Sequence, residues 1–211
     1  MFFRVLIFLL GTAALSTGIA TVTNAHLGTG SISALAYVLT LITGVSMGAY
    51  VFLTNVIFFL VEIAVDPTSI WKKALAQIPT VFLFSAFIDI AMMLTASLTP
   101  DTLWGQLIMV LIGCTVIGFG ISAMVHARLA ILPPEGAVLA VMKRWGGSFG
   151  TLRMGVDVVI VTAGVILSFA FFGELRGIGI GTIIAALVSG NMAKLFLKGW
   201  AKFSPKHHAV D

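Results

Sequence analysis

Four polar residues stand inside long apolar stretches of this 211-residue chain: Asn55, Asp89, Asp157 and Asn191. A carboxylate at the centre of a bilayer is costly unless it is paired, hydrated or protonated. Such residues mark solute sites, ion sites or proton relays, or they hydrogen-bond across helices and hold them together. We therefore take the four residues as a candidate substrate- or ion-binding set, with a purely structural role as the alternative.

Two basic residues lie close to this set. Arg153 precedes Asp157 by four residues and Lys194 follows Asn191 by three, so each base shares a helical face with its neighbour. If both acids are paired with bases, the site suits a zwitterion or a neutral polar solute. If the acids are free, it suits a cation, or coupling to protons through carboxylate protonation. The sequence leaves both options open.

Five further residues are candidates for supporting or gating roles. Ser46 and Ser148 lie in two Gly-x-Ser-x-Gly turns, and Glu135 follows a pair of prolines. Glu135 either caps a short helix or faces the entrance of a pathway. His26 and His126 follow long apolar stretches, and a histidine there either relays protons near neutral pH or is a plain interfacial residue.

Several kinds of chemistry find no support in the sequence. We find no nucleophile–base set, no paired histidine ligands at helical spacing and no phosphate-binding Gly-Lys-Ser/Thr loop. Cys114 is the single cysteine, so neither a disulfide nor a thiolate metal site can form within one chain. The Gly-x-Ser-x-Gly turns lack a strand–turn–helix context, and close helix packing explains their small residues better. We expect neither an enzyme nor a bound metal or cofactor.

Composition sets the class of protein. The chain is 59% hydrophobic and 9% charged, against about 25% charged in soluble domains. This composition predicts an all-α polytopic membrane protein, residues 1–211 forming a single membrane domain. The net charge of +4 is no sign of nucleic-acid binding.

The expected partners are the lipid bilayer and a small-molecule solute, with a second copy or a partner membrane subunit as candidate protein partners. The six predicted transmembrane helices span 2–23, 46–65, 75–98, 104–125, 148–172 and 178–198.

Two further helices are too short to cross a bilayer, which takes about 20 residues. The first follows a glycine-rich loop within 25–45, and the second spans 133–145 and ends in Lys143, Arg144 and Trp145. We expect re-entrant or interfacial half-helices, because broken backbone at membrane depth must be covered by protein or line a cavity. A surface helix in a loop is the alternative for 133–145.

An internal repeat relates the two halves of the chain. A shift of 102 positions places the Gly44–Gly48 turn on the Gly146–Gly150 turn, Asn55 on Asp157, and Asp89 on Asn191. The predicted repeats are 1–101 and 103–203, followed by a flexible tail at 204–211. Each repeat contains three transmembrane helices and one half-helix.

Charge placement predicts the topology. An even number of spans puts both termini on one side, which also carries nine basic residues, and only Arg176 lies opposite. The positive-inside rule therefore makes both termini cytoplasmic. Three spans per repeat mean that the repeats are inverted, as in transporters whose site lies at the midplane between the halves. We expect a transporter for a small polar or charged solute. A substrate-binding subunit of a multi-component uptake system and a non-transporting scaffold or regulator are the alternatives. The nine basic residues on the predicted cytoplasmic side are Arg4, Lys72, Lys73, Arg128, Lys143, Arg144, Lys198, Lys202 and Lys206.

Two glycine-rich strings give the chain a family resemblance. The string Thr43-Gly44-Val45-Ser46-Met47-Gly48 follows a Leu-Gly loop, and the closing stretch runs from Ile178-Gly179-Ile180-Gly181-Thr182 to Leu195-Phe196. With these motifs and its six spans, the chain resembles the YczE/YitT group of bacterial integral membrane proteins. The resemblance implies a protein of the bacterial cytoplasmic membrane and names no substrate.

Overall fold

The computed structural model describes residues 1–68 and 70–203, and all the regular structure within these ranges is α-helical. The predicted tail at 204–211, which includes Lys206, and the side chain of Lys202 lie outside the described residues. The helices are α1 (Phe2–Asn24), α2 (Ala34–Thr43), α3 (Met47–Val65), α4 (Ile70–Thr95), α5 (Leu103–Ala127), α6 (Pro133–Trp145), α7 (Phe149–Phe172) and α8 (Ile180–Phe203).

Six of the described helices, all except α2 and α6, are long and apolar enough to cross a membrane, which confirms the six predicted spans. Their spanning segments of 19 to 25 residues correspond to about 28 to 38 Å of helix, against a hydrocarbon core of about 30 Å. The helix that contains the third span is longer at its start than the span predicted from about 75. Helix α4 already begins at Ile70 and continues through Pro79, which lies inside the helix.

The Gly-x-Ser-x-Gly turns end one helix and begin the next. Gly44 and Gly146 have φ angles of 75° and 81°, a backbone region that favours glycine, and they stop α2 and α6. The side chains of Ser46 and Ser148 then accept hydrogen bonds from backbone N–H groups in the first turns of α3 and α7. These turns therefore redirect the chain from a short helix into a long one.

Close packing is the wrong explanation for three of the four glycines in these turns. A Cβ atom on Gly44, Gly146 or Gly150 would meet no neighbouring atom within 4 Å. Gly48 is the exception, because a Cβ there would lie 2.6 Å from the carboxylate of Asp89. Of these four positions, Gly48 is thus the one at which the neighbouring helix α4 leaves no room for a side chain.

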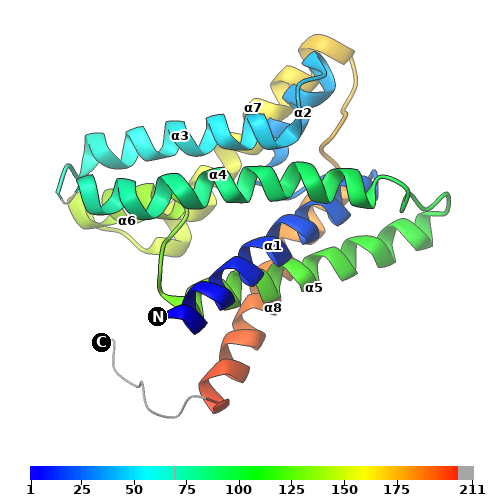
Figure 1. Cartoon of the computed structure of the whole chain (residues 1–211). Coiled ribbons are helices and arrows are strands. Elements are labelled where there is room, and N and C mark those ends of the chain that lie inside the picture. Colours follow the sequence, from blue (N-terminus) through cyan, green and yellow to red (C-terminus); the bar gives the residue numbers. More distant parts are fainter. Residues whose placement is uncertain (69, 204–211) are drawn as a thin grey trace.

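Helices α1 and α5 cross at the centre of the molecule through glycines (Figure 1). A Cβ on Gly18 would lie 2.8 Å from the backbone oxygen of Gly113, and one on Gly120 would lie 2.7 Å from that of Gly11. Residues later in α1 contact residues earlier in α5, so the two helices are antiparallel. Such close approach of backbones is typical of helix packing in membranes.

One further long helix packs on each member of this central pair. Helix α4 lies on α1, where Ser16 donates to the backbone oxygen of Phe84 (3.2 Å) and Asn24 donates to Thr95 Oγ1 (2.8 Å). These contacts advance together, so α4 runs parallel to α1. Helix α8 packs on α5, close to Gly118.

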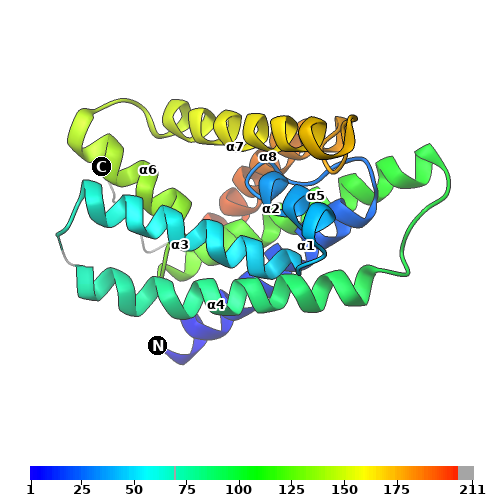
Figure 2. The same ribbon diagram turned by 90° about the horizontal axis from the view of Figure 1, so that it is seen from above.

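The remaining helices form the outer part of the fold. Helix α3 packs along α4 and against α6, and α3 and α4 lie side by side in both views (Figures 1 and 2). Helix α7 packs against α2 and α6. Within residues 1–68 and 70–203, however, α7 has no extensive packing against α8 to match that of α3 against α4. The two halves of the fold therefore differ, because α3 packs along α4 whereas α7 does not pack along α8 in the described part of the chain.

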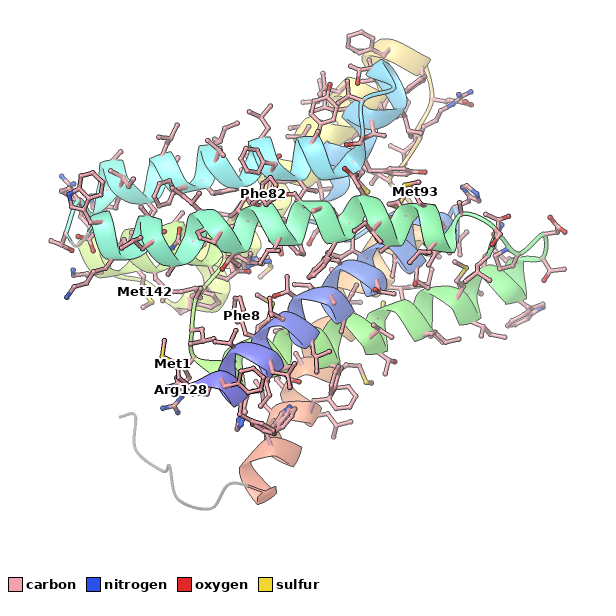
Figure 3. The ribbon with its side chains drawn as sticks, viewed as in Figure 1. Met1, Phe8, Phe82, Met93, Arg128 and Met142 are labelled. Atoms are coloured by element: carbon pink, nitrogen blue, oxygen red, sulfur yellow. The ribbon has the colours of Figure 1, made fainter. Side chains whose placement is uncertain are left out.

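Basic residues gather where α1 and α4 begin. The guanidinium group of Arg4 donates to the backbone oxygens of Ala127 (2.9 Å) and Arg128 (3.1 Å), and Arg128 lies beside Met1 in Figure 3. Lys143, at the end of α6, forms a 3.0 Å ion pair with Asp66, between α3 and α4. One end of the bundle is thus strongly basic.

Candidate functional site

A cavity of about 790 Å³ lies between the helices. Residues of α1, α3, α4, α5, α6, α7 and α8 line it, together with the loops that precede α2 and α6. Most of the lining is apolar, with Leu15, Ile19 and Phe84 among the larger side chains. Its size and character match those of small-molecule sites, which are mostly apolar with a few placed polar groups.

A charged cluster forms one wall of this cavity. Arg153, in the second turn of α7, forms an ion pair with Glu135 at the start of α6, and its Nε lies 3.5 Å from Asp157 Oδ1. The predicted i,i+4 pair between Arg153 and Asp157 is confirmed. The three side chains are only about a quarter exposed (25–26%), so water screens their charges weakly. Of the two alternatives for Glu135, the structure places its carboxylate in the cavity wall.

Several polar atoms of the lining have no hydrogen-bond partner among the described residues. They include Glu135 Oε2, which is buried, and also Asp157 Oδ1 and Arg153 Nε, which face each other in their ion pair at 3.5 Å without forming a hydrogen bond. Asn55 is only 2% exposed, and its Nδ2 donates to the backbone oxygen of Val51 (2.8 Å), which leaves its buried Oδ1 without a partner. Buried polar groups are normally paired, so atoms in this state can still accept hydrogen bonds from other molecules or donate to them.

The four residues of the predicted set do not all meet. The structure brings Asn55 and Asp157 into the lining of one cavity and leaves Asp89 and Asn191 outside it. Asp89 instead accepts hydrogen bonds from Ser46 Oγ (2.7 Å) and from the backbone N–H of Gly48 (2.6 Å). A carboxylate in this position stabilises the N-terminus of α3 through the helix dipole, and it ties α4 to α3.

The equivalent residues of the second half are apart. Asn191 is exposed on α8 and donates to the backbone oxygen of Leu187, one turn earlier in its own helix (2.9 Å). Ser148 is bonded to Thr151, within the first turn of α7 (2.8 Å). Lys194 is likewise exposed on α8. The contact that joins α3 to α4 thus has no counterpart between these residues of α7 and α8.

The two histidines lie away from the charged cluster. His26 is exposed, adopts a left-handed backbone conformation (φ 58°), and lines a second groove of about 460 Å³ together with Tyr37 and Arg176. His126 stacks on Trp200, with ring centroids 4.6 Å apart, and thereby joins α5 to α8. Neither histidine lines the large cavity.

A second buried polar cluster joins α3, α4 and α6. Glu62 is 3% exposed, forms a 3.2 Å ion pair with Lys73 and accepts from Gln77 Nε2 (2.9 Å). Gly136 of α6 packs directly on the Glu62 carboxylate. Neither Glu62 nor Gln77 is among the candidate residues named from the sequence. The spacing of Lys73 and Gln77 by four residues was the available signal, hidden because the third span was predicted to start at 75.

Asp66 extends this cluster beyond the membrane-spanning part of α3. Hydrogen bonds from Thr68 and from Lys143 hold the pKa of the Asp66 carboxyl well below its usual range, and the charge of Lys73 adds to the effect. The ionised carboxylate therefore holds the end of α6 against the connection between α3 and α4.

Metal coordination finds no candidate here. Within the described ranges, no three His, Cys, Asp or Glu side chains come close enough together to hold a metal ion. Cys114 is buried in α5 as a free thiol.

Comparisons with known proteins agree with the membrane fold. The model of a family described as "Family of unknown function (DUF6198)" matches residues 2–198. "Uncharacterized membrane protein YczE" of Bacillus subtilis (strain 168) is 28% identical over 130 residues, which cover 62% of this chain and 56% of that protein. The match therefore spans little more than half the length of this relative. No solved structure matches the chain.

The family match and the relative confirm the resemblance to YczE-like proteins. The six candidate spans are consistent with it, since the relative is itself named a membrane protein. Because the family match extends over nearly the whole chain, this protein belongs to the DUF6198 family and is a YczE-like multi-pass membrane protein.

Proposed function

We propose that this protein is a transporter for a small polar or charged solute, and that the large cavity is its solute site. The observation that carries the proposal is the cavity itself. It is formed by both halves of the chain, it is largely apolar, and it contains buried carboxylate and amide oxygens that have no partner within the described part of the chain. A protein that served only as a scaffold would gain stability by filling such a space with side chains.

The proposal includes two inverted repeats, and positions 102 residues apart support it. His26 and Arg128 are such a pair, and they are the two residues other than glycine with positive φ in the described ranges. Gly44 and Gly146 form another pair, and both end short helices. Equivalent positions therefore share unusual backbone conformations.

Helix packing gives the same support. Gly136 of α6 packs on Glu62 of α3, and the equivalent residues, Ala34 of α2 and Gly164 of α7, also lie together. Exchanging the halves maps the packing of α4 on α1 onto that of α8 on α5, and maps the antiparallel α1–α5 crossing onto itself. This is the pattern expected of a two-fold axis through that crossing, as between inverted repeats.

The departure from this symmetry suggests how the transporter works. Gly48 packs tightly on Asp89, whereas its equivalent, Gly150, faces open space, and Asn191 bonds within its own helix. In the proposed cycle, closure of α3 on α4 accompanies separation of α7 from α8, and the reverse arrangement forms the second state. The halves rock around the cavity, and α2 and α6 act as re-entrant or interfacial half-helices at its two ends.

The orientation follows from charge. The basic end of the bundle, marked by Arg4, Lys73 and Lys143, would face the cytoplasm of a bacterial cell, which places both termini there. We assign no catalytic role to any residue.

A ligand screen tests the proposal. Purified protein is heated with small polar metabolites at two pH values, because a ligand that binds the folded state raises the melting temperature. We expect a stabilising compound whose effect is lost in Asp157→Asn and kept in Asp101→Asn, an exposed acid used as a matched control. If no compound stabilises the protein and it co-purifies with an ATPase subunit or another partner, the subunit or scaffold alternative replaces the transporter.

A further inference from the structure

The charged side chains that line the cavity, two acidic and two basic, are not equally buried. Glu135 and Asp157 both face the single guanidinium group of Arg153. The other charged residue of the lining, Arg128, is exposed and lies beside Met1 at the start of α1 (Figure 3). The enclosed part of the site thus holds two carboxylates and one cation, and the excess negative charge favours a cationic ligand.

Hydrogen-bonding capacity is unbalanced in the same direction. Two buried oxygen atoms of the lining, Glu135 Oε2 and Asn55 Oδ1, lack a partner among the described residues, whereas the other two lining atoms without a hydrogen bond, Asp157 Oδ1 and Arg153 Nε, face each other at 3.5 Å within their ion pair. Asn55 and Asp157 lie on different helices, and the amide of Asn55 is almost completely buried. A group with several donors and no acceptor would suit these oxygens, and an ammonium group carries three donors and no acceptor.

The rest of the lining is suited to hydrocarbon. Ile19, Phe84, Ile88, Ile117 and Ile121 contribute to walls that are far more apolar than polar. A calcium ion requires about six to eight oxygen ligands, more than such walls offer. An anion would be repelled by the uncompensated carboxylate. The ligand that fits both parts of the cavity has a cationic head and an apolar body.

We propose that the cavity binds an organic ammonium ion with an apolar body, with its N–H groups directed at Asp157, Glu135 and Asn55. This inference rests on the proposed function, because it assigns the class of solute for the same cavity. The ammonium group would relieve the unpaired oxygens, and the hydrocarbon would fill the space lined by α1, α4 and α5.

Three probes with the same six-carbon chain test the assignment: hexylammonium, hexan-1-ol and hexanoate. Binding to the full chain in lipid nanodiscs is measured by calorimetry at pH 7, and the signal from protein-free nanodiscs is subtracted. We expect hexylammonium to bind at least about tenfold more tightly than hexan-1-ol, because charge-assisted hydrogen bonds are the stronger ones, and hexanoate to bind most weakly.

Variants locate the ammonium group. Asp157→Asn should weaken hexylammonium binding by about tenfold to a hundredfold and leave hexan-1-ol unchanged, since it removes charge without changing shape. Asp101→Asn, the same change at an exposed site, should alter neither. If Asp157→Asn does not fold, Glu135→Gln provides the same test. Equal binding of the three probes, tightest binding of hexanoate, or no effect of these variants would overturn the assignment.

Uptake into proteoliposomes separates this inference from the proposed function. Hexylammonium that binds as expected but is not taken up supports the ligand class and contradicts transport. Uptake of hexanoate or of a neutral solute without that of hexylammonium supports transport and overturns the ligand class.

Discussion

Removing the carboxylate of Asp89 should open the contact between α3 and α4. This carboxylate accepts from Ser46 Oγ at 2.7 Å and from the backbone N–H of Gly48 at 2.6 Å. Asp89→Ala removes both hydrogen bonds and the favourable charge at the N-terminus of α3. The Ser46 hydroxyl can still cap α3 through Ala49, so the helix itself should persist.

The expected magnitude follows from these two bonds. Hydrogen bonds to charged groups contribute about 1.5 to 3 kcal/mol each. Because Ser46 is exposed and Asp89 only half-buried, we take about 1 kcal/mol for each bond, the net value of an ordinary hydrogen bond, and the loss to the closed contact is about 2 kcal/mol. In the proposed two-state cycle, this multiplies the population ratio by about 30 in favour of the state in which α7 and α8 are closed.

Disulfide cross-linking measures this shift. Ser148→Cys and Asn191→Cys, introduced in a Cys114→Ser background, report closure of α7 on α8. The yield should rise strongly when Asp89→Ala is added and remain unchanged with Asp101→Ala, the same substitution at an exposed loop residue. An unchanged yield in Asp89→Ala protein that is folded would refute the coupling between the two contacts.

Three other substitutions and one titration test further parts of the account. Gly113→Leu should destabilise the fold by about 3 kcal/mol, because a Cβ there already lies 3.0 Å from the backbone of α1; unfolding in sodium dodecyl sulfate measures this, and wild-type stability contradicts it. Lys73→Met leaves the Glu62 carboxylate buried without its ion-pair partner, at a cost of about 3 kcal/mol. Adding Glu62→Gln should recover most of that loss in the same assay, and failure to recover it excludes charge burial as the cause. Asn55→Leu removes a buried unpaired oxygen, so we expect a higher melting temperature together with lost ligand binding; retained binding contradicts a role in the site. The pKa of Asp66 is lowered on folding, so its contribution to stability is complete above its ordinary pKa of about 4 and is lost as the pH falls below that value. The difference in melting temperature between wild type and Asp66→Asn should therefore shrink below about pH 4, and a constant difference contradicts the assignment.

Most of the helices could be predicted because a bilayer imposes simple rules. A spanning helix must be long, apolar and satisfied within its own backbone, so residues such as Gly44, Asp66 and Pro133 mark where each helix stops or starts. The sequence does not reveal that α4 begins as early as Ile70, because the first turn of this helix carries Lys72 and Lys73, and lysines are typical of a connection between helices.

The geometry of the candidate site was less predictable. Repeat symmetry brought Asn55, Asp89, Asp157 and Asn191 together in the expected arrangement, but symmetry in sequence does not require both halves to adopt the same conformation. In this structure, Asp89 binds the N-terminus of α3 while Asn191 remains on the surface of α8. No local pattern in the sequence reports which of two equivalent contacts is closed, since that depends on the packing of whole helices.

The pairing of charges was predictable only where it was local. Arg153 and Asp157 are four residues apart on one helix, so their ion pair follows from helix geometry. The contact between Arg153 and Glu135 depends on how α6 turns into α7, and the burial of Gln77 beside Glu62 depends on how α3 packs on α4. Both are tertiary features; the first has no local signature in the sequence, and the signal for the second is the four-residue spacing of Lys73 and Gln77.

Alternating access can be tested without knowledge of the solute by measuring whether the cavity is reached from each side of the membrane. Ser189 lines the cavity, so Ser189→Cys in a Cys114→Ser background can be treated with a membrane-impermeant thiol reagent in right-side-out and inverted vesicles. Lys72→Cys, at the basic end, serves as the control for sidedness. A transporter that alternates between two states predicts labelling of Ser189→Cys from both sides and of Lys72→Cys from one. Labelling of Ser189→Cys from one side only, or from neither, would contradict the account.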